Sequence, residues 1–185
     1  MTKQLFALAA AVAAFALPAS AMADLPLGAA APNFVTQGAL AGKPIVFQLG
    51  QALRKGPVVL YFYPKSFTQG CTLEARAFAE AMDDFTKAGA TVIGLSADSL
   101  ATQQKFSTEH CRDKFPVGVA SGSIIKAYDV ALLGPLGGLV SMTKRTSYVI
   151  GRDGRIKLAY SNMDYRDHVR VTLDTVRGLQ AGTIR

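Results

Sequence analysis

The chain has 185 residues, of which 50% are hydrophobic, and carries a formal net charge of +7 from 20 Lys and Arg against 13 Asp and Glu. The basic residues are scattered, without a cationic run or interleaved aromatic residues, so nucleic-acid binding has no support. The two cysteines form no Cys-x-x-Cys pair and the two histidines lie far apart, which argues against a zinc or haem site, and no cofactor is expected. A lone histidine such as His110 or His168 is typical of a surface or helix-end position.

The first 23 residues are typical of a secretory signal peptide. Lys3 is followed by the apolar run LFALAAAVAAFAL, and AMA at 21–23 supplies an Ala-x-Ala cleavage pattern. A retained membrane anchor is the alternative, but the apolar run is about 13 residues long and a membrane span needs about 20. We therefore expect residues 1–23 to be removed, and residues 24–185 to form one domain in the periplasm or outside the cell.

Patterns of apolar residues then alternate between strand and helix. Residues 24–55 are rich in Gly, Ala and Pro and predict an irregular lead-in with small edge strands. Residues 58–63, VVLYFY, predict a buried central strand. The later predicted elements, in chain order, are a helix from Cys71 to Gly89, a strand at 91–96, a helix at 99–110, a strand at 115–120, a short helix at 123–128, two strands flanking the hairpin signal at 151–154, and a helix at about 167–179. This order predicts an α/β fold, a mixed sheet with helices on both faces.

The segment PKSFTQGC, at 64–71, joins the central strand to the next helix. A cysteine that opens a helix feels the partial positive charge of the helix N-terminus, which favours the thiolate. Pro64 lacks an N–H donor and fixes the path of the loop. Thr68 lies one helical turn before Cys71, where its hydroxyl can face the sulfur or a bound ligand. This pattern predicts a reactive cysteine rather than one that only packs.

The stretch YFYPKSFTQGCTLEA, at 61–75, resembles the active-site segment of the peroxiredoxins, most closely that of the bacterioferritin comigratory protein subgroup. The Pro-x-x-x-Thr-x-x-Cys pattern of that family falls on Pro64, Thr68 and Cys71. GAAAPNF near the start of the mature chain, AGATVIGLSADS after the first helix and RTSYVIGRDGRI toward the end resemble family segments in the expected order. The resemblance implies a thioredoxin-like fold and thiol peroxidase activity.

The resemblance also implies a role for each matching residue. Cys71 would attack the O–O bond of hydrogen peroxide or an alkyl hydroperoxide and become a sulfenic acid. Thr68 would orient the peroxide, and Pro64 would shield the sulfur from solvent. Arg145 matches the arginine of the family, and its permanent charge would favour the thiolate and stabilise the charge that develops on the breaking O–O bond. Glu74, one turn after Cys71, either holds Arg145 or is an ordinary first-turn carboxylate.

The sequence departs from the subgroup at one position. Many members carry a second cysteine five positions after the first, but that position is Arg76 here. Either Cys111 or an outside thiol must therefore resolve the sulfenic acid, and we expect Cys111.

The implied partners are a peroxide and a thioredoxin-like or other thiol reductant. No nucleic acid is expected as a partner, and no membrane after signal removal. The protein is expected to be a monomer or weak dimer. The segment LLGPLGGLVSMTK, at 132–144, fits a pocket wall, a partner surface or a flexible loop.

Two other functions are open at this point. An exported thioredoxin-like thiol–disulfide oxidoreductase needs a second sulfur close to the first, commonly as Cys-x-x-Cys, but Thr68 occupies the place of the first sulfur. A non-catalytic binding domain with a structural Cys71–Cys111 disulfide leaves the set of Pro64, Thr68 and Arg145 unexplained.

Overall fold

The structure is a computed structural model, which describes residues 25–133 and 139–184. The signal peptide expected at 1–23 lies outside these residues. The helices and strands, in chain order, are β1 Val35–Leu40, β2 Lys43–Gln48, α1 Leu49–Lys55, β3 Val58–Phe62, α2 Gln69–Lys87, β4 Thr91–Ser96, α3 Leu100–Glu109, β5 Val117–Val119, α4 Gly122–Ala127, β6 Ala131–Leu133, β7 Leu139–Thr143, β8 Thr146–Ile150, β9 Ile156–Ser161 and α5 His168–Gln180. Among the described residues, no helix is long and apolar enough to cross a membrane.

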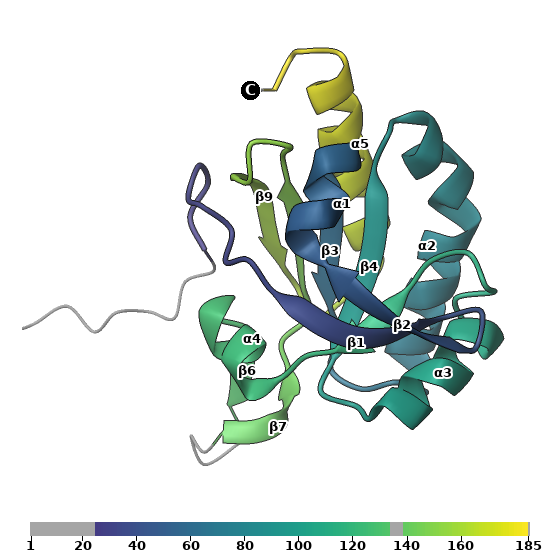
Figure 1. The fold of residues 1–185 in the computed structure, drawn as a ribbon. Helices are drawn as coiled ribbons and strands as arrows, with labels where there is room; N and C mark the ends of the chain where they lie inside the picture. The colour runs from purple at the N-terminus through teal and green to yellow at the C-terminus, as the bar shows by residue number, and fades with distance from the viewer. Residues whose placement is uncertain (1–24, 134–138, 185) are drawn as a thin grey trace, which may run out of the picture.

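A seven-stranded sheet with the strand order β2-β1-β5-β4-β3-β8-β9 forms the centre of the molecule (Figure 1). β4 is parallel to both β3 and β5, whereas β8 is antiparallel to both β3 and β9. β1 pairs antiparallel with β2 and with β5. The mixed sheet confirms the predicted α/β, thioredoxin-like fold.

Helices cover both faces of the sheet, as predicted. Successive side chains of a strand point to opposite faces. Val59 and Tyr61 of β3 therefore pack in one apolar cluster with residues of α2, α3 and α5, and Val58 and Leu60 pack in another with residues of α1 and α4. All four of these β3 residues are fully buried, so β3 is the central strand that the sequence predicted.

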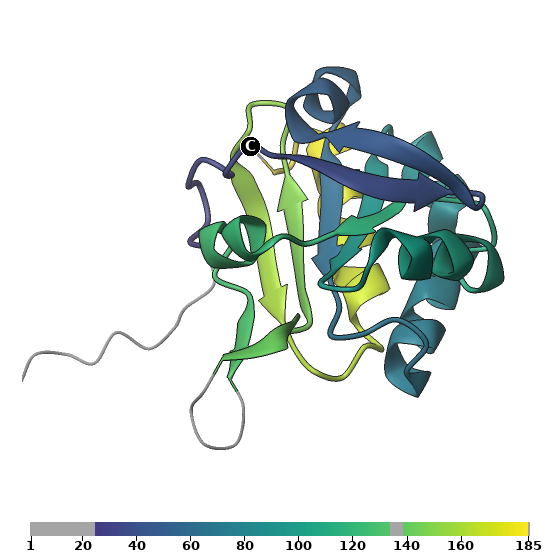
Figure 2. The same cartoon turned by 60° about the horizontal axis from the view of Figure 1, so that its bottom comes forward.

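A second, two-stranded sheet is formed by β6 and β7, which span most of the 132–144 segment, and residues 134–138 of that segment lie outside the described residues. β6 pairs antiparallel with β7, and Figure 2 shows this hairpin extending away from the seven-stranded sheet. The Thr143 hydroxyl at the end of β7 donates to the Tyr63 carbonyl at 2.8 Å. This bond ties the chain just before Arg145 to the chain that leads from β3 to Cys71.

The lead-in at 24–55 differs most from the prediction. The small strands expected there form the β1–β2 hairpin at one edge of the sheet, whose turn has positive φ at Ala41 (50°) and Gly42 (73°), but helix α1 was not predicted. α1 has no acidic residue in its first turn and no side-chain hydrogen bond at its N-cap, so the sequence carries no start signal for it. Its buried residues Leu49 and Ala52 hold it against the sheet. The other predicted elements are present, although the strand expected at 115–120 is only Val117–Val119.

Candidate active site

Cys71 lies in the first turn of α2, directly after the loop that follows β3. Thr68 is the N-cap residue, and its carbonyl accepts the first intrahelical bond from the Thr72 N–H at 2.9 Å. The amides of Gln69, Gly70 and Cys71 therefore precede the hydrogen-bonded ladder, in the turn that carries the partial positive charge of the helix N-terminus. Cys71 is a free thiol with 2% of its surface exposed. An anionic sulfur at this position is stabilised by the helix itself.

Arg145 lies between β7 and β8 and brings its guanidinium to the sulfur. Nη2 donates to Cys71 Sγ at 3.4 Å, Nε donates to the Met163 carbonyl at 3.0 Å, and Nη1 donates to Glu74 Oε2. Burial disfavours the positive charge, but the nearby Glu74 and Cys71 outweigh this effect and raise the pKa of Arg145. The guanidinium is therefore fixed by three contacts and stays charged beside the sulfur.

The other two residues of the predicted motif lie in the loop before α2. Thr68 is exposed, and its hydroxyl donates to the Lys65 carbonyl at 2.9 Å, so its hydrogen is used within the loop while its oxygen can still accept a bond. Pro64 is half-buried at the end of β3. The structure thus brings Arg145 and Glu74 to Cys71, whereas the peroxide-orienting role of Thr68 and the shielding role of Pro64 stay predictions.

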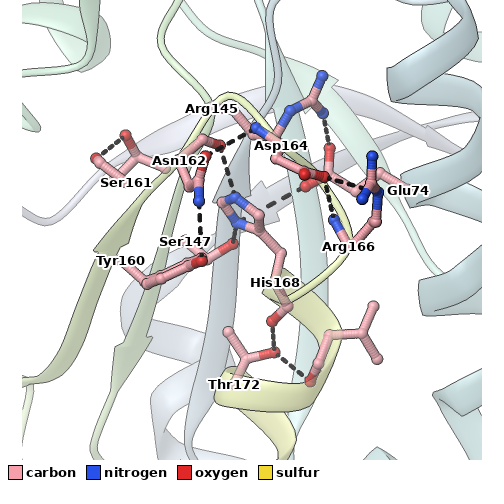
Figure 3. Close-up of polar contacts among 12 residues, drawn as sticks. Glu74, Arg145, Ser147, Tyr160, Ser161, Asn162, Asp164, Arg166, His168 and Thr172 are labelled. Carbon is pink, nitrogen blue, oxygen red and sulfur yellow. Dashed lines mark hydrogen bonds and ion pairs between the residues drawn. The ribbon is translucent and has the colours of Figure 1, made fainter.

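His168 is a site residue that the sequence analysis missed. It is the first residue of α5 and therefore lies at a helix end, but it is fully buried, and its ring lies close to Glu74 (Figure 3). Its Nδ1 lies 2.7 Å from Ser147 Oγ and 3.8 Å from Glu74 Oε1, and its Nε2 lies 2.9 Å from the Asn162 carbonyl oxygen. The helix-end alternative of the prediction is therefore confirmed, whereas the complete burial was not predicted, because the periodicity of α5 cannot show which residue at its start faces α2.

Burial shifts the protonation of both Glu74 and His168. Burial raises the pKa of Glu74 to about 8, even though the charge and hydrogen bond of Arg145 lower it. Burial also lowers the pKa of His168 to about 4, against a raising effect from its hydrogen bond to Asn162. The uncharged form is therefore favoured at both residues.

These two shifts predict how stability depends on pH. A raised folded-state pKa adds stability that is lost as pH rises through it, and a lowered one adds stability that is lost as pH falls through it. The contribution of His168 to stability therefore changes between pH 4 and its ordinary pKa of 6.5. The contribution of Glu74 changes between its ordinary pKa of 4.5 and pH 8. Between pH 6.5 and pH 8 the main change in this pair is the loss of the Glu74 proton in the folded chain. This deprotonation should lower the free energy of unfolding by on the order of 2 kcal/mol.

Urea unfolding at pH 6.5 and pH 8 will test this, with Glu74→Gln as the variant that cannot titrate. The wild-type protein should lose more stability over this interval than Glu74→Gln does. Equal losses in the two proteins would show that Glu74 is already ionised in the folded chain at pH 6.5.

Cys111 is separate from the contacts just described. It follows the end of α3, is completely buried, and lies in the same apolar cluster as Cys71. It is a free thiol, and burial raises its pKa well above the ordinary value. In this conformation Cys111 is therefore a protonated, unreactive thiol.

Comparison with known proteins places these features in a family. A model described as the AhpC/TSA family matches residues 27–159. The chloroplastic peroxiredoxin Q of Oryza sativa subsp. japonica is 34% identical over 163 residues, which cover 82% of this chain and 67% of the rice protein. Peroxiredoxin Bcp of Bacillus subtilis is 32% identical over 123 residues, covering 66% of this chain and 78% of that protein.

Solved structures give the same result. Peroxidoxin BcpB from Mycobacterium tuberculosis matches with a TM-score of 0.73 and 31% identity, covering 83% of this chain and 97% of that one. The bacterioferritin comigratory protein of Xanthomonas campestris matches with a TM-score of 0.69 and 26% identity, covering 78% of this chain and 91% of that one.

The fold, the sulfur site and the relatives all define the same class of protein, a thiol-dependent peroxidase with a thioredoxin-like fold. The chain belongs to the AhpC/TSA family, and its relatives are peroxiredoxins of the Q and bacterioferritin comigratory protein group, as its motif predicts. The comparisons decide against the thiol–disulfide oxidoreductase and the non-catalytic binding domain that the sequence had left open.

Proposed function

We propose that this peroxidase reduces hydrogen peroxide and alkyl hydroperoxides at Cys71, and that Cys111 then resolves the oxidised sulfur. The observation that carries the first part is the 3.4 Å contact between Arg145 Nη2 and Cys71 Sγ at the start of α2. The Xanthomonas relative, whose structure is described in terms of alkyl peroxide reduction, supports the inclusion of alkyl hydroperoxides.

The first step is a displacement at oxygen. The Cys71 thiolate attacks one peroxide oxygen, the S–O bond forms as the O–O bond breaks, and Cys71 becomes a sulfenic acid. The other oxygen leaves as hydroxide or alkoxide and takes a proton from solvent. Arg145 stabilises the charge on the attacking sulfur and on the leaving oxygen. The guanidinium does not have to move for this, because its contacts already hold it in place. Peroxide consumption by the purified protein with dithiothreitol as reductant tests this step.

The second step joins the two sulfurs. The Cys111 thiol attacks the sulfur of the sulfenic acid, the S–S bond forms, and water leaves with the thiol proton. An external dithiol of thioredoxin-like type then reduces the disulfide. Cys71 and Cys111 are 2% and 0% exposed, so an external dithiol cannot reach a disulfide between them until the surrounding chain opens. The catalytic cycle is therefore expected to include local unfolding around the two cysteines.

The chain just after Cys111 is suited to such unfolding. Arg112 and Asp113 are both exposed and have positive φ values of 51° and 59°. A non-glycine residue in this left-handed region costs about 1 kcal/mol or more. Release of this turn relieves that strain and offsets part of the cost of exposing Cys111.

Phe67 connects this turn to the loop before Cys71. Its φ is 67°, its side chain is 42% exposed, and its ring lies edge-on to the rings of Phe106 and His110, with 5.3 Å between centroids in both pairs. Unwinding of the first turn of α2 moves Phe67 away from α3 and so loosens the end of α3 beside Cys111. The two helix ends are thereby expected to open together.

One equivalent of hydrogen peroxide should convert the reduced protein to an intramolecular Cys71–Cys111 disulfide. Intact-mass spectrometry should then show the loss of two hydrogens, and thiol titration should show the loss of both free thiols. In Cys111→Ser, the same treatment should leave a sulfenic acid at Cys71 that only an external thiol removes. A stable sulfenic acid with reduced Cys111 in the wild-type protein would show that an outside thiol resolves Cys71.

We also propose that the protein works outside the cytoplasm after removal of residues 1–23. The cationic start, the short apolar run and the AMA pattern at 21–23 support this proposal. The intact mass of protein purified from its own host reports whether residues 1–23 are still present.

A further inference from the structure

The peptide that joins Lys65 to Ser66 has both of its polar groups bound to side chains. Its N–H donates to Asp98 Oδ2 at 2.7 Å, and its carbonyl accepts a hydrogen bond from the Thr68 hydroxyl at 2.9 Å. The peptide is planar and trans, so its N–H and its carbonyl point in opposite directions. The side chain that holds the N–H therefore also sets the direction in which the carbonyl meets Thr68.

The Thr68 hydroxyl does not cap the helix that begins after it. A threonine at an N-cap usually accepts a hydrogen bond from an amide of the first turn, but the Thr68 side chain makes no such bond. Its hydrogen is committed to the Lys65 carbonyl, so its oxygen can only accept. Thr68 is exposed, and Cys71 lies in the first turn of the same helix. The oxygen can therefore accept the O–H group of a peroxide that approaches the sulfur.

Asp98 is itself fixed by a hydrogen-bond network. Its Oδ2 also accepts from the Ser96 hydroxyl at 2.8 Å, and the Ser96 oxygen accepts from Gln103 Nε2 at 2.8 Å. Gln103 Oε1 accepts from the Tyr63 hydroxyl at 2.7 Å, and Ser96, Gln103 and Tyr63 are each 0% exposed. The Tyr63 oxygen lies 3.3 Å from Ser66 Oγ, which must be the donor because the Tyr63 hydrogen is already used. The network is thus a closed ring that begins and ends at Ser66.

We propose that Asp98 is a positioning residue for the peroxide reaction: it holds the Lys65–Ser66 peptide in the orientation that makes Thr68 a hydrogen-bond acceptor for the peroxide. The proposal rests on the proposed reaction at Cys71. If the peptide were flipped, its carbonyl would face the Asp98 carboxylate, and two acceptors would meet without a hydrogen between them. The N–H would then face the Thr68 oxygen, and the Thr68 hydrogen would turn outward. Asp98 disfavours this second orientation.

A double-mutant cycle between Asp98 and Thr68 tests this connection. Asp98→Leu keeps the approximate size of the side chain and removes the acceptor, and Thr68→Val removes the hydroxyl. Each single variant should slow the single-turnover oxidation of Cys71 by hydrogen peroxide about 10-fold, a coupling typical of groups in one hydrogen-bond network. The double variant should react at the rate of Thr68→Val alone, because no hydroxyl is left to orient. Asp98→Ala repeats the cycle with a smaller side chain, and slow alkylation of the buried Cys111 shows that each variant is folded.

Alkylation of Cys71 by iodoacetamide is measured in parallel, because this reaction needs the thiolate but no peroxide O–H group. Its rate should not fall in Asp98→Leu. Asp98→Asn should restore most of the peroxide rate, since its amide oxygen can still accept from the Ser66 N–H. Ser99→Ala is the matched control, because the Ser99 hydroxyl caps α3 next to Asp98 and its hydrogen bonds are to Thr102. This control should react with peroxide at the wild-type rate.

Three results would overturn the proposal. The first is a wild-type peroxide rate in either single variant. The second is an effect of Asp98→Leu that is as large in the Thr68→Val background as in the wild-type chain. The third is a parallel fall in the rate of alkylation, which would show that Asp98 acts on the thiolate. All three leave Cys71 as the oxidised residue, whereas a wild-type protein in which peroxide does not oxidise Cys71 would refute the proposed function itself.

Discussion

Cys71→Ser should abolish peroxide consumption, which is the largest effect that we expect from any single substitution. A serine hydroxyl at the start of α2 stays protonated at neutral pH and cannot replace a thiolate in attack on the O–O bond. Cys111 cannot substitute for it, because Cys111 is fully buried and its burial raises the pKa of its thiol. Peroxide loss should be measured over many turnovers with dithiothreitol as reductant.

Cys111→Ser is the control for this experiment. It removes the other sulfur of the chain but leaves Cys71 and its contacts with Arg145 in place. This variant should still oxidise Cys71 once for each peroxide molecule. Turnover of Cys71→Ser at the wild-type rate would place the chemistry at another residue.

Arg145→Lys should lower the rate of the peroxide step on the order of 10²-fold or more, the loss typical of removing one fixed electrostatic contact. Three different nitrogens of the guanidinium contact Cys71, Glu74 and the Met163 carbonyl. A lysine ammonium has its donors on one nitrogen, at the end of a flexible stem, and cannot make these three contacts together. The positive charge is retained, so the substitution tests the geometry of the contacts.

Single-turnover oxidation of Cys71 by hydrogen peroxide, followed by rapid quenching, measures this effect. Arg152→Lys is a matched control, because Arg152 is exposed in the turn between β8 and β9 and has no contact with the site. The control should react at the wild-type rate. A near-normal rate for Arg145→Lys, with unchanged thermal stability, would show that Arg145 provides only charge.

Much of the fold follows from the sequence because the decisive patterns are local. Residues 58–63 form a continuous run of apolar, β-branched and aromatic residues, which is typical of a strand buried on both faces, and β3 is such a strand. Ser99 signals the start of α3, and its side chain accepts a bond from the Thr102 N–H. α1 and the β6–β7 pair were missed because they depend on contacts with distant parts of the chain rather than on a local start or stop signal.

The residues of the candidate site also differ in whether the sequence could identify them. Cys71 and Arg145 could be identified because the motif around each is contiguous in the sequence. His168 could not, since its position beside Glu74 arises only when α5 packs on α2 and β8. The positive φ values of Phe67 and Arg112 also leave no sequence signal, since neither residue is glycine, asparagine or aspartate.

The most direct test of the central claim, that Cys71 is the residue oxidised by peroxide, is to trap the sulfenic acid in Cys111→Ser. The variant should be treated with one equivalent of hydrogen peroxide and a sulfenic-acid reagent such as dimedone, digested, and mapped by mass spectrometry. The adduct should appear on the peptide that contains Cys71, at close to one per chain, and should be lost when Arg145→Lys is added and the reaction is sampled at short times. A protein that consumes peroxide without an adduct on Cys71 would contradict the claim.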